Sequence, residues 1–234
     1  AFYQEAYAQF HADPAFVERA RARVVLLQGG DAETLRLWQR LSDRSRVYFN
    51  RIYRALDVTL TDADLAGEST YNAALAGVCD ELEGAGIATI SDGALCIFLD
   101  GFTGRDDTPL PLIIRKSDGG YGYGTTDLAT IRHRVTTLGA DRMLYVVGAT
   151  QAVHLQMVFA AARRAGWVPD DVATIHVQIG TVLGDDRKML KTRSGNPFRL
   201  MALLDEAVGA ARRVIDERRP EMDDTTRAEV ARQI

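Results

Sequence analysis

The chain has few cysteines and no long apolar segment, and each shortage excludes a class of protein. Only Cys79 and Cys96 occur in 234 residues, both in apolar surroundings. Two cysteines cannot build a disulfide scaffold, so we predict buried free thiols in a reducing compartment. No apolar run approaches the length of a membrane-spanning helix, and no secretory signal opens the sequence. We therefore expect a soluble, cytoplasmic protein with no membrane partner.

Histidine and net positive charge are also scarce. The four histidines lie far apart, and none pairs with a cysteine at zinc spacing, so we expect no metal site. Because 28 cations stand against 32 anions, the formal charge is −4, and no global basic surface indicates nucleic acid. A local basic face can still occur on an acidic protein.

The first 56 residues of the sequence carry apolar residues at helical spacing. Asp13 and Pro14 form an N-cap followed by proline at the first helical position, and Gly29-Gly30 ends that helix. A third helix begins near Asp31, with an apolar side and an arginine-rich side. This pattern favours a solvated amphipathic face over an RNA-binding stripe.

From Asp57 the pattern changes to short β-prone runs. We predict a strand at 58–60, a helix at 69–83, and a hairpin of residues 87–90 and 94–99 joined by the turn Ser91-Asp92-Gly93. Two prolines then lead into a further strand at 112–115.

The second half alternates helix and strand, which predicts an α/β fold with a buried parallel sheet. The expected elements are helices at 125–138, 151–165 and 198–218 and strands at 142–147 and 173–179. Ligands bind such sheets beyond the carboxyl ends of the strands. The loops at that position are expected at 115–127, 148–154 and 180–195.

The first loop combines glycines with a phenol and a carboxylate. Its glycines do not fit the dinucleotide-binding spacing, and it lacks a Walker lysine. Tyr123 and Asp127 stand four residues apart at a helix start, so they face the same way. Such a pair suits a planar cation such as guanidinium. An aspartate there also complements the helix dipole, and spacing alone leaves both roles open.

The second loop places Gln151 and His154 in the first turn of a helix, beyond a strand end. A histidine at this position tends to be neutral, because the positive end of the helix dipole disfavours its charged form. It suits a hydrogen bond to ribose or phosphate. A bond to neighbouring backbone is the ordinary alternative.

The third loop, Gly184 to Gly195, is rich in cations. Arg187, Lys188, Lys191 and Arg193 stand within seven residues. Their charges suit a polyphosphate, whereas a basic loop without further context indicates only a solvated surface.

The order of residues in this loop resembles a known signature. Lys188-Met189-Leu190-Lys191-Thr192 is similar to the Lys-Met-Ser-Lys-Ser sequence of class I aminoacyl-tRNA synthetases. The stretches Gly67–Asn72, Ser91–Ala94 and Tyr123–Asp127 resemble arginyl-tRNA synthetases in the same order. The resemblance covers essentially the whole chain.

This resemblance implies a Rossmann-type parallel sheet interrupted by a connecting insertion. Residues 1–110 would form the helical and β-hairpin insertion with its flanks, and residues 111–234 the second half of the catalytic domain. The family's His-Ile-Gly-His signature is absent, as are its tRNA-elbow and anticodon-binding domains. We therefore expect a central fragment or truncated relative that is inactive alone.

The resemblance also implies a reaction, in which arginine is activated with ATP and Mg²⁺ and transferred to tRNA, with no tightly bound cofactor. The residues with implied roles are Tyr123, Asp127 and Gln151 for arginine, and His154, Lys188 and Lys191 for ATP. Lys191, with Lys188, would stabilise the leaving pyrophosphate, and the backbone of residues 179–182 would meet the adenine.

Two other functions compete with this one. A truncated paralogue would bind arginine, a nucleotide or a partner without catalysis, and an unrelated nucleotidyltransferase would carry a convergent loop. In either case, a parallel sheet without its first strands leaves an open edge, which predicts self-association.

Overall fold

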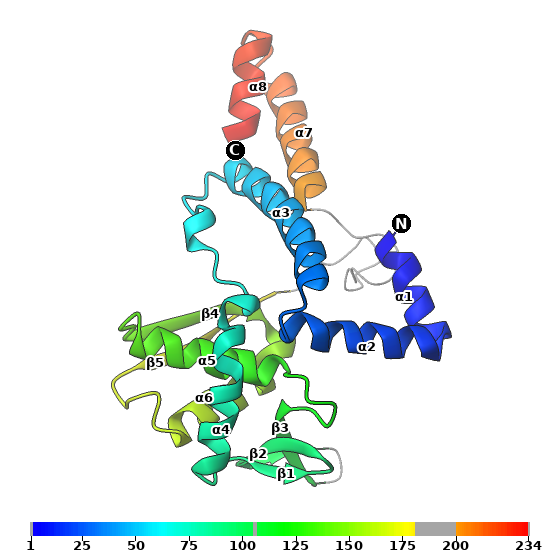
Figure 1. The fold of residues 1–234 in the computed structure, drawn as a ribbon. Helices are drawn as coiled ribbons and strands as arrows, with labels where there is room; N and C mark the ends of the chain where they lie inside the picture. Colours follow the sequence, from blue (N-terminus) through cyan, green and yellow to red (C-terminus); the bar gives the residue numbers. More distant parts are fainter. Residues whose placement is uncertain (1, 105–106, 181–199, 234) are drawn as a thin grey trace. The chain divides into compact units, whose positions relative to one another are not determined.

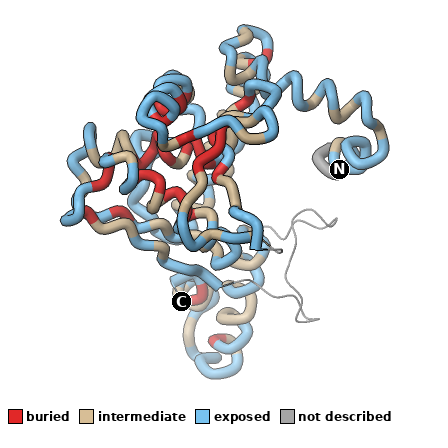
Figure 2. Tube along the Cα trace, turned by 90° about the horizontal axis from the view of Figure 1, so that it is seen from below, coloured by how far each residue is buried: buried red, intermediate tan, exposed pale blue. Residues whose placement is uncertain are grey.

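The computed structural model describes residues 2–104, 107–180 and 200–233. The chain divides into two compact units. The smaller unit comprises residues 1–13, 37–64 and 182–234, and the larger unit residues 14–36 and 65–181. The larger unit contains both sheets and most of the buried residues, which are red in Figure 2. The boundary near residue 110 concerns the family's domain plan and stays a prediction.

The helices predicted at both ends of the chain are present (Figure 1). They are α1 (Phe2–Ala12), α2 (Pro14–Gln28), α3 (Ala32–Ala55), α7 (Leu200–Arg218) and α8 (Asp224–Gln233). Helix α2 begins at Pro14 as predicted. Asp31 caps α3, because its Oδ1 accepts hydrogen bonds from the backbone N–H of Thr34 at 2.9 Å and from its hydroxyl at 2.6 Å.

The strand predicted at 58–60 is wrong. These residues belong to no strand or helix, and they precede the short 3₁₀ turn η1 (Asp62–Asp64). Val58 and Leu60 are exposed, so the apolar residues that indicated a strand have no sheet to pack into. The predicted helix at 69–83 is two elements, a 3₁₀ segment η2 (Glu68–Ala74) followed by α4 (Leu75–Gly84).

The predicted hairpin is confirmed in the larger unit. Strand β1 (Thr89–Ser91) pairs antiparallel with β2 (Ala94–Thr103). Asp92 and Gly93 between them both have positive φ, at 49° and 77°, as a two-residue primed turn requires.

The following strand lies elsewhere than expected. Strand β3 (Pro109–Arg115) pairs antiparallel with β2 and forms the edge of this three-stranded sheet. The expectation that the loop after it follows a strand of the parallel sheet is therefore wrong. Pro109 and Pro111 fit an edge, because proline has no N–H to give to a second neighbour.

The parallel sheet consists of β4 (Arg142–Gly148) and β5 (Ala173–Ile179) among the described residues. The turn η3 (Ala149–Gln151) and helix α6 (Ala152–Arg164) connect them, as predicted. On one face, Tyr145 packs edge-to-face on Phe159 of α6. The opposite face exposes Leu144 and Val146, at 55% and 57%. The expected burial of both faces is not observed in this chain.

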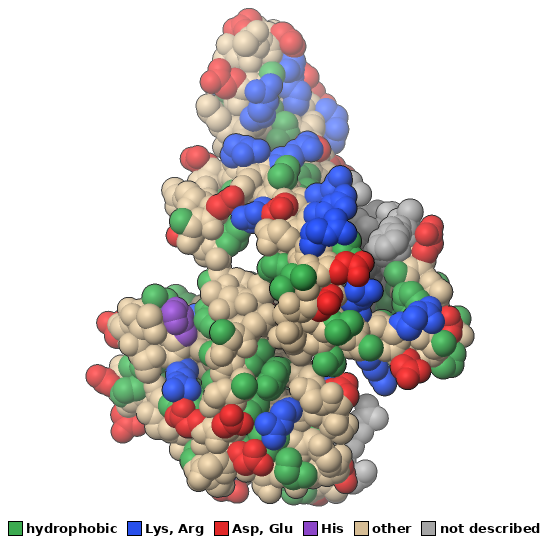
Figure 3. Space-filling model, in the orientation of Figure 1, with side chains coloured by type: hydrophobic (Ala, Val, Ile, Leu, Met, Phe, Trp, Pro, Cys, Tyr) green, Lys and Arg blue, Asp and Glu red, His purple; other side chains and the backbone are tan. Residues whose placement is uncertain are grey.

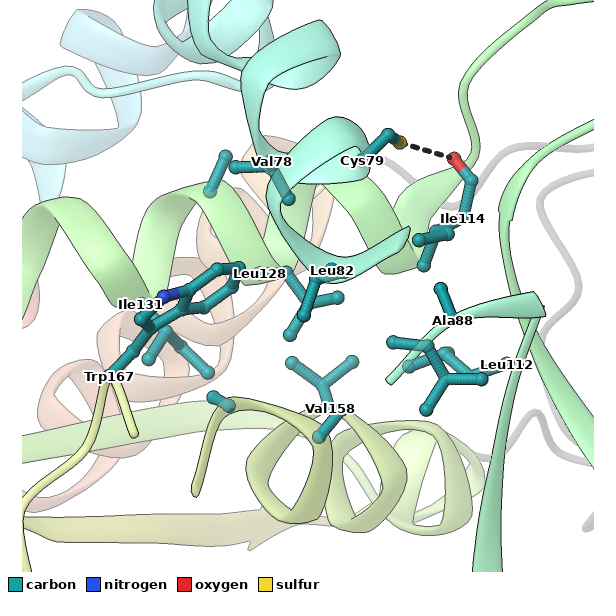
Figure 4. Packing of buried hydrophobic residues seen from close by; sticks show 14 of the residues in the cluster. Val78, Cys79, Leu82, Ala88, Leu112, Ile114, Leu128, Ile131, Val158 and Trp167 are labelled. Carbon is teal, nitrogen blue, oxygen red and sulfur yellow. Dashed lines mark hydrogen bonds between the residues drawn. The ribbon is translucent and has the colours of Figure 1, made fainter. Parts of the chain in front are cut away.

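The core of the larger unit lies between helices α4, α5 (Tyr123–Thr136) and α6 and the strands β2 and β3 (Figure 4). Cys79 and Cys96 are buried free thiols, as predicted. The Cys79 Sγ lies 3.7 Å from the carbonyl oxygen of Ile114, to which it donates. The core therefore links α4 to β3, directly before the loop that leads to α5.

Candidate active site

The first turn of α5 is fixed against β3 by small and polar residues. Gly124 approaches so closely that a Cβ there would lie 3.0 Å from Leu112 Cδ1 and 3.1 Å from the Ile113 oxygen. The buried hydroxyl of Thr125 donates to the carbonyl of Ile114. These contacts hold the start of the helix in place, and with it the two predicted ligand residues, Tyr123 and Asp127.

Tyr123 and Asp127 differ in exposure. The side chain of Asp127 is 32% exposed, whereas Tyr123 is 72% exposed. The Tyr123 phenol is therefore accessible to a ligand. The Asp127 carboxylate, four residues later in the helix, is partly buried.

Asp127 contacts the histidine of the second loop. The distance from His154 Nε2 to Asp127 Oδ2 is 2.6 Å, and the His154 side chain is also 32% exposed. An ionised carboxylate can only accept a hydrogen bond, so Nε2 carries the proton and donates. The structure thus brings together two of the predicted site residues, which are 27 positions apart in the sequence.

Sequence reasoning missed a second carboxylate at this site. Burial raises the pKa of Glu68, at the start of η2, and the nearby negative charge of Asp127 raises it further. Glu68 lies in the stretch Gly67–Asn72 that supported the family resemblance, but nothing in its spacing marked it as a ligand. Two carboxylates in one another's field favour a bound cation.

Two tyrosines of the larger unit, Tyr71 and Tyr145, are also constrained by their neighbours. Tyr71 of η2 is buried and packs edge-to-face on His133, with ring centroids 5.7 Å apart. Burial raises the pKa of Tyr145, whereas the guanidinium of Arg134, 5.1 Å from the centre of its ring, opposes that rise. Tyr145 thus stays a neutral phenol, and the negative charge of Asp127 also raises its pKa.

The remaining predicted residues are only partly covered. Gln151 is the N-cap residue of α6 and is exposed, three positions before His154 at the same helix end. Lys188 and Lys191 lie outside the described residues, as does the end of the adenine-contact segment beyond Gly180.

Two further findings concern the described part of the chain. Residues 2–104, 107–180 and 200–233 hold no group of three or more His, Cys, Asp or Glu arranged for a metal ion. Within the same ranges, none of the helices has the length and apolarity to cross a membrane.

The helices and the parallel strand pair agree with a catalytic domain of the class I tRNA synthetase type. The family model described as "tRNA synthetases class I (R), catalytic domain" matches residues 1–234. The chain therefore belongs to the arginine family of class I tRNA synthetase catalytic domains.

Individual relatives agree with this assignment. The chain is 64% identical over 234 residues to an arginine–tRNA ligase of Thermobifida fusca (strain YX), covering 100% of this chain and 40% of the relative. It is 52% identical over 218 residues to one of Frankia casuarinae, covering 93% and 37%. The chain thus spans about two-fifths of the length of these relatives.

Solved structures show the same fold. The crystal structure of arginyl-tRNA synthetase from Plasmodium falciparum matches with a TM-score of 0.73 at 24% identity, covering 97% of this chain and 38% of that one. The Thermus thermophilus arginyl-tRNA synthetase matches with a TM-score of 0.60 at 23% identity, covering 96% and 42%. At these identities the likeness concerns the fold.

Proposed function

We propose that this chain is part of an arginine–tRNA ligase, which activates arginine with ATP to arginyl-adenylate and transfers it to tRNA. Family membership supports the proposal, and so does Asp127 of α5, which bonds His154 and whose charge raises the pKa of Glu68 in η2. Because the chain spans only 40% of the Thermobifida relative, the complete reaction belongs to a longer protein.

The observation that carries the choice of arginine is Asp127, a partly exposed carboxylate bonded to His154, with Glu68 in its electrostatic field. A guanidinium is planar and has five N–H donors, so it can bond two carboxylates and a phenol at once. Asp127 and Glu68 would accept from it, and the exposed Tyr123 would line the same site. Gln151, at the N-terminus of α6, would contact the other end of the amino acid. A lysine substrate offers no such fork, which gives discrimination.

The chemistry is an in-line attack of the arginine carboxylate on the α-phosphorus of ATP, with pyrophosphate leaving. We infer that Lys191, with Lys188, neutralises the charge that develops on the leaving group. The backbone after β5, from Ile179 on, would meet the adenine. Mg²⁺ would arrive with ATP as part of the substrate.

The domain plan follows from the same family. We infer that residues 1–110 correspond to the connecting insertion with its flanks, and residues 111–234 to the second half of the catalytic domain. The cytoplasm, where tRNA is charged, is the location that fits this function. Because this sequence contains no His-Ile-Gly-His signature for ATP, the 234-residue chain alone should catalyse no ATP–pyrophosphate exchange.

The test is an Asp127→Asn substitution in the full-length protein. The change keeps the side-chain size but removes the charge that faces the guanidinium, so we expect the KM for arginine to rise by about 100-fold, from the loss of charge-assisted bonds of roughly 1.5–3 kcal/mol each. The KM for ATP should change less than twofold. Both are measured by arginine-dependent ATP–pyrophosphate exchange with tRNA present.

Asp141→Asn is the matched control, because Asp141 is exposed at the start of the β4 region and has no assigned role. An Asp127→Asn enzyme with wild-type arginine kinetics would remove the assigned site. Robust exchange by the 234-residue chain alone would show that it needs no His-Ile-Gly-His signature for catalysis.

A further inference from the structure

The contact between Asp127 and His154 joins the second turn of α5 to the first turn of α6 at the proposed arginine site. We propose that His154 is a positioning residue for arginine. Its Nε2–H holds Oδ2 of Asp127, and this fixes the carboxylate so that Oδ1 is presented to the guanidinium. The role rests on the proposed function, since it requires arginine to be the ligand.

The geometry supports a fixed orientation. At 2.6 Å, the Nε2 to Oδ2 contact is short and has a charged acceptor, which makes it stronger than a neutral hydrogen bond. Among the described residues, His154 is the only side chain recorded as bonded to the Asp127 carboxylate. Without it, that carboxylate would be free to turn about its Cβ–Cγ bond, because such a terminal torsion is soft.

The negative charge of Glu68 explains why the Asp127 carboxylate needs a hydrogen-bond donor to fix its orientation. Glu68 lies within the field of Asp127, and like charges repel. Repulsion favours orientations of the Asp127 carboxylate that lie farther from Glu68. A donor on Oδ2 opposes that rotation. It also offsets part of the negative charge before arginine arrives.

This role differs from the nucleotide contact that the family resemblance implied for His154. In the structure, Nε2 is occupied by Asp127, and Asp127 belongs to the amino-acid end of the site. Direct contact between His154 and ATP is therefore the alternative. Kinetics distinguish the two roles, because a positioning residue changes the KM for arginine and an ATP contact changes the KM for ATP.

The experiment compares His154→Ala and His154→Gln in the full-length protein by ATP–pyrophosphate exchange with tRNA present. Glutamine carries a terminal N–H at about the reach of Nε2, so it can still donate to Asp127. We expect His154→Ala to raise the KM for arginine at least tenfold, with kcat and the KM for ATP within about twofold. His154→Gln should recover most of the arginine affinity. A residue that only supports the fold would not produce this selective change and rescue.

His176→Ala is the matched control. His176 is also partly buried in the larger unit and bonds through Nε2, at 3.1 Å, but to the backbone oxygen of Val147. Its loss should lower the melting temperature comparably and leave the KM for arginine unchanged.

Each contrary outcome has a separate meaning. A wild-type full-length protein that does not activate arginine would overturn the proposed function. With an active wild type, the positioning role fails if His154→Ala leaves the arginine KM unchanged or raises the ATP KM instead. It also fails if His154→Gln is as impaired as alanine, or if His176→Ala raises the arginine KM equally.

Discussion

Cys79 is the residue whose chemistry the fold changes most. Its thiol is fully buried in the core of the larger unit, and this burial raises its pKa to about 11. Only the thiolate is a strong nucleophile. At pH 8 the Cys79 thiol is protonated and inaccessible to reagents, and both conditions suppress its reaction. We expect a thiol reagent such as 5,5′-dithiobis(2-nitrobenzoate) to label Cys79 only after unfolding. Rapid labelling of the native protein at this site would contradict the buried position.

The same shift gives a pH dependence of stability. The folded-state pKa lies above the ordinary value near 9, so the thiol's contribution is complete below about pH 9 and is lost as the pH rises through about 11. A Cys79→Ala variant separates this effect from the titration of tyrosines and lysines. Its urea midpoint, compared with wild type, should become relatively higher between pH 9 and 11. Parallel curves for the two proteins would show that the thiol does not contribute.

The residue scale also shows where sequence reasoning stops. The helix that carries Tyr123 and Asp127 could be predicted, because its pattern is local, whereas their joint role in binding arginine stays a prediction. The bond from His154 to Asp127 could not be predicted, because it depends on how α5 and α6 pack. Glu68 was missed for the same reason, since its link to Asp127 exists only in three dimensions.

At the scale of elements, the start of α5 depends on a close approach that only glycine permits. A Cβ at Gly124 would lie 3.0 Å from Leu112 Cδ1 and 3.1 Å from a backbone oxygen that cannot move freely. We expect Gly124→Ala to destabilise the protein by about 1–3 kcal/mol, as overpacking does, and to raise the KM for arginine in the full-length enzyme. Urea unfolding and exchange kinetics measure the two effects.

Gly122→Ala provides the comparison two residues earlier. Its φ is −106°, and the nearest atom to an added Cβ is 3.7 Å away, which is an ordinary contact. The cost should stay below about 1 kcal/mol, because the only loss is a slightly poorer N-cap residue. Equal costs at both positions would mean that the approach of α5 to β3 is not tight.

The elements themselves were predictable wherever their pattern was local. The strand at 173–179 and the helix that ends at Arg218 match the prediction, because their apolar patterns are local. The sheet partner of β3 and the absence of a strand at 58–60 were not predictable. The strand pairing of each segment depends on whether another strand lies alongside it in the fold. An apolar run in the sequence does not show which segment that is.

At the scale of the whole molecule, the chain exposes one face of its parallel sheet. Leu144 pairs with Ile175 and Val146 with Val177, so these side chains line one face together with Ile179. All five are exposed, by 39% to 57%. A two-stranded sheet is also marginal by itself, since three or more strands with a covered face are usual. The longer relatives have more chain with which to cover such a face.

We therefore expect the isolated 234-residue chain to self-associate and to bind a hydrophobic dye such as 8-anilinonaphthalene-1-sulfonate. The charged double variant Leu144→Glu, Val146→Glu should reduce both, because it places carboxylates in the apolar face. Leu138→Glu is the control, since Leu138 is 65% exposed but lies outside the sheet. Sedimentation velocity between about 5 and 100 µM measures the association. If the wild-type chain remains monomeric and binds no dye over this range, the exposed sheet face does not drive association. If Leu138→Glu reduces association as much as the double variant does, the added negative charge rather than the sheet face is responsible.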